Sequence, residues 1–343
     1  MTKYYAGLDV SMKKTYVVVT DVSGKIVRQR ELATEIEDLA SYLSDRKNMR
    51  VCLESGSISH WLARGLTQAG FEVIVAEARH LERFLSARTN KNDKNDAIGI
   101  AEALRVGLVK PVAVKSETAQ AQQVLLGSRR QLHQSARTLA NAVRGQLKSV
   151  GIRLPQSLSH SRLIHEVNEV SGDLDAISHS SIESLCKALA EMDCQIKRLD
   201  QQLKATAREN SRATLLQSLP GVGPVTSMTF ISTIDDPERF QNSRMVGAYL
   251  GLSPRQYASG EINHIGHISK RGHGECRSML YEAALSILTR CKQPSKLQEW
   301  GKRLMKKKGT KKAAIAVARK LATIMHRMLI TGELFDPNHT VRA

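Results

Sequence analysis

The sequence predicts an α/β domain followed by a mainly helical region. Between residues 4 and 30, β-branched and aromatic side chains alternate in three runs, and a Ser-Gly-Lys turn separates the second run from the third. This pattern is typical of three strands, at least two of them in a hairpin. Beyond residue 97, apolar residues recur at spacings of three and four, which indicates helices. At 343 residues the chain is long enough for more than one core.

Helices and strands alternate after the opening hairpin. We expect a helix over residues 34–45, a short buried strand over 49–56, a helix over 59–71 and a strand over 72–78. Because strands alternate with helices, the region from 1 to 110 is predicted to be a domain with a mixed sheet.

The middle region, residues 111–211, is predicted to hold long helices and a connecting loop. The helical pattern runs from residue 97 to about 151 and is only weakly interrupted, at Gly107 and Pro111. Residues 152–181 are mostly polar and contain a proline, which favours a loop.

A heptad seam follows this predicted loop. Apolar side chains and one threonine recur without a slip at Ile182, Leu185, Leu189, Met192, Ile196, Leu199, Leu203 and Thr206. This spacing is typical of a coiled coil. The helix either packs back on the preceding helix of its own chain or pairs with another subunit in a dimer or tetramer, and the spacing favours neither.

The third region, residues 212–343, opens with two helical patterns joined by a Pro-Gly-Val-Gly turn. This arrangement is similar to a helix-hairpin-helix, in which backbone N–H groups at glycines such as Gly221 and Gly223 bind a DNA phosphate. A plain turn between two helices is the structural alternative.

Positive charge indicates a polyanionic partner. Lysine and arginine total 51 against 33 acidic residues, which gives a net charge of +18. From Lys270 to Arg327 there are 16 basic residues and three acidic ones. The candidate phosphate-binding side chains are Arg255, Lys270, Arg271, Lys306, Lys307, Lys308, Lys311 and Lys312.

Cysteine and hydropathy patterns exclude other classes of protein. The five cysteines form no C-x-x-C pair, so neither a disulfide framework nor a four-thiolate zinc site is indicated. No apolar run approaches the roughly 20 residues that cross a bilayer. We therefore expect a soluble, cytoplasmic protein without a membrane partner.

Four acidic residues form the first candidate site. Asp9 lies in an apolar strand, Glu54 ends a later strand, and Asp93 and Asp96 open a helix with i, i+3 spacing. A carboxylate in an apolar strand is costly unless it binds a cation. Carboxylates in this order are the arrangement of the ribonuclease H-like fold, which holds Mg²⁺ against a phosphodiester. The structural alternative is a set of helix caps and strand ends. The competing acids Asp21, Glu77 and Glu102 are interpreted as structural or solvated.

Ser259 is the second candidate, as a nucleophile in a positive field. It lies beside a glycine, with Arg255, Lys270 and Arg271 near it in sequence. The spacing alone favours a turn residue. The neighbouring residues His264, His267, His273 and Cys276 are compatible with zinc but match no standard module.

Seven segments together carry a resemblance to a known family. They are YAGLDVSMKK, CLESG, NKNDKNDA, LPGVGPVTS, RFQNSRMVGAYLGLSPRQYASG, ISKRGHGECRSMLYEAA and LFDPN. In this order, from Tyr4 to about Asn338, they resemble the insertion-sequence-110 family of DEDD transposases, which includes the Piv-type DNA invertases. No single segment is specific, but the acidic tetrad combined with the P-G-V-G and Y-x-S-G segments is.

The resemblance implies a RuvC-like N-terminal domain, a coiled-coil connection and a C-terminal transposase domain. It implies that Asp9, Glu54, Asp93 and Asp96 bind Mg²⁺ and that Ser259 attacks a DNA phosphate to form a phosphoserine intermediate. It also implies a structured non-coding bridge RNA that pairs with donor and target double-stranded DNA, which the net charge fits. Two rival functions stay open: a RuvC-like nuclease that hydrolyses DNA or junctions, and a non-catalytic nucleic-acid binding protein.

Overall fold

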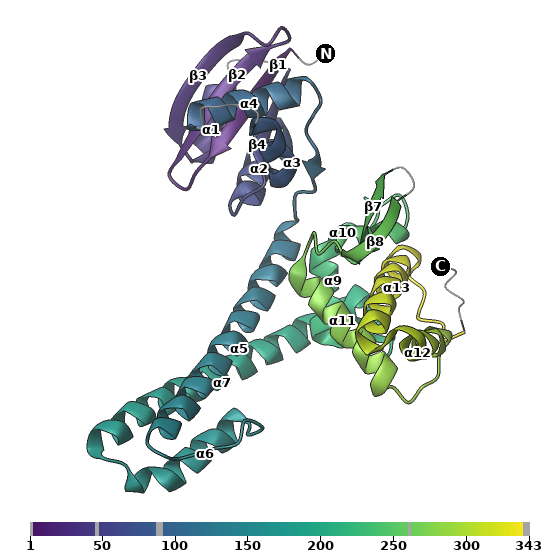
Figure 1. Ribbon diagram of the computed structural model, residues 1–343. Coiled ribbons are helices and arrows are strands. Elements are labelled where there is room, and N and C mark those ends of the chain that lie inside the picture. The colour runs from purple at the N-terminus through teal and green to yellow at the C-terminus, as the bar shows by residue number, and fades with distance from the viewer. Residues whose placement is uncertain (1–2, 45–47, 87–91, 260–261, 339–343) are drawn as a thin grey trace. The chain divides into compact units, whose positions relative to one another are not determined.

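The protein consists of two compact units, Met1–Lys115 and Ser116–Ala343 (Figure 1). The structure, a computed structural model, describes residues 3–44, 48–86, 92–259 and 262–338. The division at residue 115 lies near the end of the predicted N-terminal domain. Within the described ranges, no helix is long and apolar enough to cross a membrane.

The first unit is built on a six-stranded mixed sheet with the strand order β3-β2-β1-β4-β5-β6. Its strands are β1 (Tyr4–Val10), β2 (Lys14–Asp21), β3 (Ile26–Ala33), β4 (Met49–Glu54), β5 (Glu72–Ala76) and β6 (Pro111–Val112). The central strand β1 runs antiparallel to β2 and parallel to β4. The predicted opening strands and the predicted mixed sheet are thus confirmed.

Helices pack on both faces of this sheet. They are α1 (Ile36–Ser44), α2 (Ser59–Gln68), α3 (Ala78–Leu85) and α4 (Asp93–Arg105). On one face, Leu8 and Leu53 of the sheet pack against Leu62 of α2. On the other face, Cys52 of β4 packs against Ile100 of α4. Because side chains alternate along a strand, each central strand supplies residues to both cores.

The weak interruptions predicted at Gly107 and Pro111 are a complete break in the helical pattern from residue 97 to 151. Helix α4 ends at Arg105, and Gly107 adopts a positive φ of 74° as the chain turns away. Pro111 and Val112 then form β6 at the sheet edge, where a proline is tolerated because it need not donate to a ladder. The next helix, α5, begins only at Glu117.

The second unit opens with a pair of long helices that pack against each other, α5 (Glu117–Ser149) and α7 (Ala176–Glu209) (Figure 1). Ile182, Leu189 and Ile196 of the heptad seam pack with Ala140 and Val143 of α5. The seam is therefore covered within its own chain, as the intramolecular alternative predicts. Oligomerisation stays a prediction, and an oligomer would have to form through surfaces other than this seam.

The loop predicted over residues 152–181 is present over 152–159 and wrong from residue 160 on. This segment contains α6 (His160–Val170), a short 3-10 helix (Ser171–Asp173) and the start of α7. Ser159 caps α6 by accepting the N–H of Arg162, and Asp175 caps α7. The polar composition predicted a loop, but Ser159 and Asp175 occupy cap positions, for which serine and aspartate are preferred.

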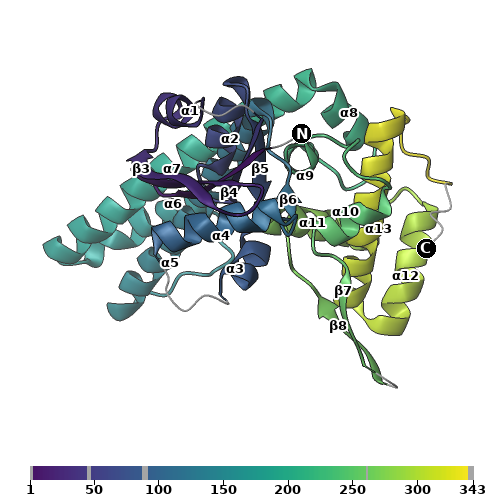
Figure 2. The ribbon, with the colours of Figure 1, turned by 90° about the horizontal axis from the view of Figure 1, so that it is seen from above.

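The remaining helices form a second core around α11 and α13. They are α8 (Ser211–Gln217), α9 (Pro224–Ile234), α10 (Arg244–Tyr249), α11 (Gly274–Thr289), α12 (Lys296–Lys308) and α13 (Thr310–Thr331). Phe230, Leu280 and Leu321 are fully buried in this core. A two-stranded sheet, β7 (Pro254–Ser259) and β8 (Ile262–Ile268), projects from these helices (Figure 2).

Candidate active site and nucleic-acid interface

Asp9 and Glu54 are neighbours at one edge of the sheet in the first unit. Strands β1 and β4 pair in parallel, and their last paired residues are Leu8 and Leu53. Asp9 and Glu54 are the next residues on each strand, so both lie at the carboxyl ends of adjacent parallel strands. They share the face opposite to Leu8, because residues of equal parity in a parallel pair face the same side. Both side chains are partly exposed.

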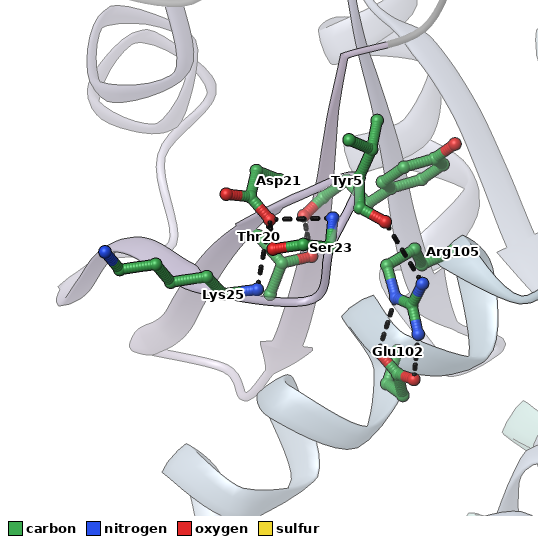
Figure 3. Close-up of polar contacts among 8 residues, drawn as sticks. Tyr5, Thr20, Asp21, Ser23, Lys25, Glu102 and Arg105 are labelled. Carbon is green, nitrogen blue, oxygen red and sulfur yellow. Dashed lines mark hydrogen bonds and ion pairs between the residues drawn. The ribbon is translucent and has the colours of Figure 1, made fainter.

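Helix α4 runs along this same face. Gly7 lies two residues before Asp9, and a Cβ on Gly7 would come within 2.2 Å of the Ala97 carbonyl oxygen and 2.3 Å of the Ala101 nitrogen. At the start of the strand, Tyr5 lies near Arg105 at the other end of the helix (Figure 3). The helix is therefore antiparallel to β1, and its N-terminus lies toward Asp9.

Asp93 and Asp96 form the first turn of α4. Asp93 precedes Ala97 by one helical turn of about 5.4 Å, and Asp9 follows Gly7 by about 6.6 Å of strand. The two distances match, so the first turn of the helix and the end of β1 reach the same level. Asp9 and Glu54 thus lie at the carboxyl edge of β1 and β4, and the helix turn that holds Asp93 and Asp96 is directed toward that edge.

The capping alternative for these two aspartates is wrong. Asn92 caps α4, and its side chain accepts the N–H of Asn95 at 2.8 Å. Asp93 and Asp96 are thus not engaged as the N-cap. Their negative charge at the first turn is favourable for the helix dipole by some tenths of a kcal/mol, which is too little to explain the residue choice alone.

The four carboxylates suit a hard divalent cation. Oxygen ligands without cysteine or histidine are the donor set that Mg²⁺ prefers. Within the residues that the structure describes, however, no group of three or more His, Cys, Asp or Glu side chains is gathered closely enough to hold a metal ion. The shared edge is therefore established by register and packing, and the metal site stays a prediction.

The competing acids have structural partners in the same unit. Asp21 accepts hydrogen bonds from the hydroxyl of Ser23 at 2.6 Å and from the backbone N–H of Lys25 at 3.1 Å, which closes the β2–β3 turn (Figure 3). These hydrogen bonds, with the Ser23 hydroxyl contributing most, lower the pKa of Asp21. Glu102 pairs with Arg105 on the last turns of α4.

Arg105 also donates to the carbonyl of Val22 at 3.2 Å. The bidentate pair with Glu102 and this third bond tie the end of α4 to the β2–β3 turn. The helix is thus fixed at its C-terminal end, which leaves its acidic N-terminal turn at the opposite edge of the sheet.

Ser259 is the last residue of β7 in the second unit and pairs with Ile262 of β8. Its side chain lies outside what the structure describes. The strand register places it at the end of a hairpin ladder that also pairs Tyr257 with His264. No relationship between Ser259 and the acidic residues follows, because the two units are separate bodies.

The base of this hairpin is a tightly packed basic loop. A Cβ on Gly251 would meet the Arg271 carbonyl oxygen at 2.0 Å, and a Cβ on Gly272 would meet the Tyr249 carbonyl oxygen at 2.0 Å. Arg277 donates to the Leu250 carbonyl at 2.9 Å. Sequence reasoning missed these supports, although the repeated Gly and Arg around the loop were a signal.

Lys270 lies in this loop with a positive φ of 55°, which is uncommon for a residue with a side chain. The Lys270 and Arg271 side chains are both exposed. Strained backbone of this kind clusters at functional sites, because packing has to enforce it. The loop therefore presents two cations on a rigid frame, as binding of a phosphate requires.

Five exposed lysines surround the turn between α12 and α13. Lys306, Lys307 and Lys308 form the last turn of α12, and Lys311 and Lys312 form the first turn of α13. Lys306, Lys307 and Lys308 complement the dipole of α12, but Lys311 and Lys312 oppose the dipole of α13, and the five like charges repel one another. The placement is unfavourable for the isolated protein and favourable when a polyanion binds.

The Pro-Gly-Val-Gly turn joins α8 to α9, so two helices flank this turn as the sequence predicts. Gly221 has a φ of 80°, and a Cβ there would meet the Ala283 carbonyl oxygen of α11 at 2.9 Å. Gly221 is thus required for packing. Gly223 precedes α9 with open space around its Cβ position, so its contact with a phosphate stays a prediction.

The histidines near the hairpin have other roles. His273 caps α11 by accepting the N–H of Cys276 through Nδ1 at 3.2 Å, and Cys276 is buried. His264 is exposed on β8. The capping role of His273, the burial of Cys276 and the exposure of His264 favour separate structural roles for these residues over shared ligation of one zinc ion.

Comparison with known proteins identifies the family. Residues 6–152 match a model of the DEDD transposase domain of IS110 elements, described as a transposase, and residues 213–299 match the "Transposase IS116/IS110/IS902 family". The two matches follow each other along the chain and include all the predicted site residues except the five lysines at the α12–α13 turn. The chain belongs to the IS110/IS116 family of transposases and is a DNA recombinase.

Individual relatives agree with this assignment. The chain is 29% identical over 337 residues to the transposase for insertion sequence element IS1111A of Coxiella burnetii, covering 96% of this chain and 90% of the relative. It is 26% identical to a probable family 20 transposase of Pseudomonas aeruginosa, covering 96% and 98%. It is also 34% identical over 151 residues to the pilin gene-inverting protein of Moraxella bovis, covering 43% and 45%.

Proposed function

We propose that this transposase moves an insertion element by cutting and rejoining DNA through a phosphoserine intermediate at Ser259. In this proposal the first unit is a ribonuclease H-like domain whose Asp9, Glu54, Asp93 and Asp96 hold Mg²⁺. The observation that supports it most is the meeting of β1, β4 and the first turn of α4 at one sheet edge.

The proposed covalent step conserves the phosphodiester energy. The Ser259 hydroxyl oxygen forms a bond to a DNA phosphorus, the bond from that phosphorus to the 3′ oxygen breaks, and the serine proton ends on the released 3′-hydroxyl. Rejoining reverses these changes with a 3′-hydroxyl from another strand. No high-energy cofactor is consumed, because one ester replaces another at each step.

Mg²⁺ would neutralise the phosphate charge and the charge that develops on the leaving oxygen. The role of the chain is to place the carboxylates. The antiparallel packing of α4 on β1 requires a glycine at position 7, and the Glu102–Arg105 pair ties the far end of that helix.

The partners in this proposal are double-stranded donor and target DNA, a structured guide RNA and further copies of the chain. A net charge of +18 and few aromatic residues favour contacts to phosphates over contacts to bases. The lysines at the α12–α13 turn and the basic loop at Lys270 are the proposed phosphate contacts.

Recombination by purified variants tests the proposal. Asp9→Asn, Asp93→Asn and Ser259→Ala should each abolish strand cutting and joining while nucleic-acid binding survives. Asp21→Asn is the matched control, since Asp21 holds a turn of the same unit and an asparagine can do the same. Full cutting by Ser259→Ala would favour the hydrolytic nuclease. No cutting by the wild type, with nucleic-acid binding that is unchanged when divalent metal is removed, would favour the non-catalytic binding protein.

Site-specific inversion is a second candidate function. It is favoured by the likeness to the pilin gene-inverting protein, which reaches 34% identity over 151 residues. A plasmid that carries one pair of inverted sites distinguishes the two. Inversion requires both sites to stay on one molecule, whereas transposition moves the element to a second molecule.

A further inference from the structure

The β7–β8 hairpin has an exposed aromatic side chain in a position that packing does not explain. The two strands form a sheet of their own, and Figure 2 shows them projecting away from the helices of the second unit. Isolated two-stranded hairpins are marginally stable in water. Burial of apolar side chains would stabilise such a hairpin, yet Tyr257 is 59% exposed and Ile265 is 67% exposed. Large apolar side chains left in solvent on such a ribbon indicate a surface that binds something.

Tyr257 and Arg255 lie on one face of the ribbon. The position of a Cβ on Gly266 would be 3.7 Å from Cε2 of Tyr257 and 3.9 Å from Cβ of Arg255. Because Gly266 has no side chain, the edge of the Tyr257 ring and the Cβ of Arg255 lie beside the Gly266 backbone. The register shifts at this point, between Pro254 and Gln256. Such bulges are over-represented next to active sites, where they re-aim a side chain.

The proposed nucleophile lies further along the same strand. Ser259 follows Tyr257 by two positions on β7 and so occupies the next position of equal parity. The distance along the strand between the two α-carbons is about 6.6 Å. This is close to the distance between neighbouring nucleotides along a stretched single strand.

The charges near the ring suit a nucleic-acid backbone. In the described residues from 254 to 274, the charged side chains are Arg255, Lys270 and Arg271, and the one acidic residue of the stretch, Glu261, lies outside the described residues. Arg255 is exposed, and its guanidinium donates to the Ser269 carbonyl at 3.2 Å. An aromatic ring among cations is the combination that binds unpaired bases, through stacking on the ring and charge on the phosphates.

We propose that Tyr257 is a stacking site for an unpaired DNA base next to the cut, with Arg255 on a neighbouring phosphate. The inference rests on the proposed role of Ser259 in cutting. Tyr257 is then a positioning residue: it fixes the strand so that one phosphate stays beside the end of β7. The structural alternative is that Tyr257 only stabilises the hairpin through its cross-strand neighbour His264.

The variants separate these two roles. Tyr257→Phe keeps the ring and the strand preference, whereas Tyr257→Thr keeps the strand preference without a ring. Arg255→Gln removes one charge from the same face. Lys306→Gln removes one charge from the distant α12–α13 turn and serves as the control for a contact made only to phosphate.

The probes are two DNA strands of about 12 nucleotides, one of deoxyadenylate and one of abasic sugar-phosphate, which carry equal charge but differ in bases. Binding of each strand to the full chain is measured over a range of salt concentrations. The wild type should bind the strand with bases about tenfold more tightly than the abasic strand. Tyr257→Phe should keep this ratio, and Tyr257→Thr should lower it toward one.

The charge variants should behave differently. Arg255→Gln and Lys306→Gln should weaken binding to both strands alike and reduce the salt slope by about one phosphate contact each. The Tyr257 variants should leave the slope unchanged. A hairpin that merely unfolds in Tyr257→Thr would alter the slope as well, because Arg255 would lose its place.

Equal base-to-abasic ratios in the wild type and Tyr257→Thr would overturn the proposal. A ratio that depends on Tyr257 only for an oligoribonucleotide would assign the ring to RNA and would also contradict it. These binding experiments need no recombination. If Ser259→Ala recombines normally while the ratio still depends on Tyr257, the proposed nucleophile is wrong and the stacking site stands.

Discussion

Gly7 of β1 and Ala101 of α4 are in backbone contact. A Cβ on Gly7 would lie 2.3 Å from the Ala101 nitrogen, closer than any real Cβ contact. This approach sets the distance between the helix and the sheet, and therefore the position of Asp93 and Asp96 relative to Asp9. A residue with no functional group thus controls the geometry of the proposed acidic site.

Gly7→Ala should destabilise the first unit by about 2 kcal/mol or more, because the backbone of α4 has to move to admit the methyl group. Thermal unfolding monitored by circular dichroism measures the change. Gly56→Ala is the control in the same unit, since a Cβ there meets nothing within 4 Å. Equal melting temperatures of the two variants would show that α4 does not lie where the structure places it.

Leu189→Ala should destabilise the second unit by about 2–5 kcal/mol, since Leu189 is fully buried between α5 and α7. Lys187→Ala, two residues away on the exposed side, should change the free energy of unfolding by less than about 0.5 kcal/mol. Light scattering should give the same assembled mass for all three proteins. Dissociation of an oligomer by Leu189→Ala would mean that the seam joins subunits.

His326 should make stability depend on pH. Its Nε2 donates to the Pro237 carbonyl at 2.9 Å, and Nδ1 accepts from the Ser243 hydroxyl at 2.9 Å. Burial, with a smaller effect from Arg239, lowers the pKa of His326 from 6.5. The unfolded chain then binds the proton first, so stability should fall as pH decreases below about 6.5.

His326→Gln should remove part of this pH dependence. The slope of unfolding free energy against pH between 7 and 5 is at most about 1.4 kcal/mol per pH unit for one group. Urea titrations at several pH values measure it. A variant whose slope equals that of the wild type would show that His326 is accessible to protons in the folded chain.

Cysteine reactivity should separate buried from exposed thiols. Burial raises the pKa of Cys52 to about 12, and the residue is fully buried under α4. Cys194 is exposed on α7. Iodoacetamide at pH 8, followed by mass spectrometry, should modify Cys194 in the folded chain and Cys52 only after unfolding. Rapid modification of Cys52 would contradict the packing of α4 on the sheet.

Local patterns predicted much of the fold. Alternation over residues 4–30 identifies the strands, because successive side chains of a strand point to opposite faces of its sheet. Asp9 could be found because a carboxylate is costly in an apolar strand, and Glu54, Asp93 and Asp96 because they follow it in the order that the ribonuclease H-like fold requires. Their meeting at one edge depends on the parallel pairing of β1 and β4, which no local pattern encodes.

Other features could not be predicted from local patterns. Residues 152–181 were interpreted as a loop, since caps such as Ser159 and Asp175 have the composition of loops. Strand β6 has only two residues, too few for a period. The partner of the heptad seam was undetermined, because α5 and a second subunit would present equivalent apolar faces.

The most direct test is a crystal structure of the transposase grown with Mn²⁺, which replaces Mg²⁺ and has a measurable anomalous signal. The account predicts an anomalous peak within bonding distance of the Asp9 and Asp93 carboxylates, and none in crystals of Asp9→Asn. A peak held by other residues, or four carboxylates pointing away from one another in the presence of bound metal, would contradict it.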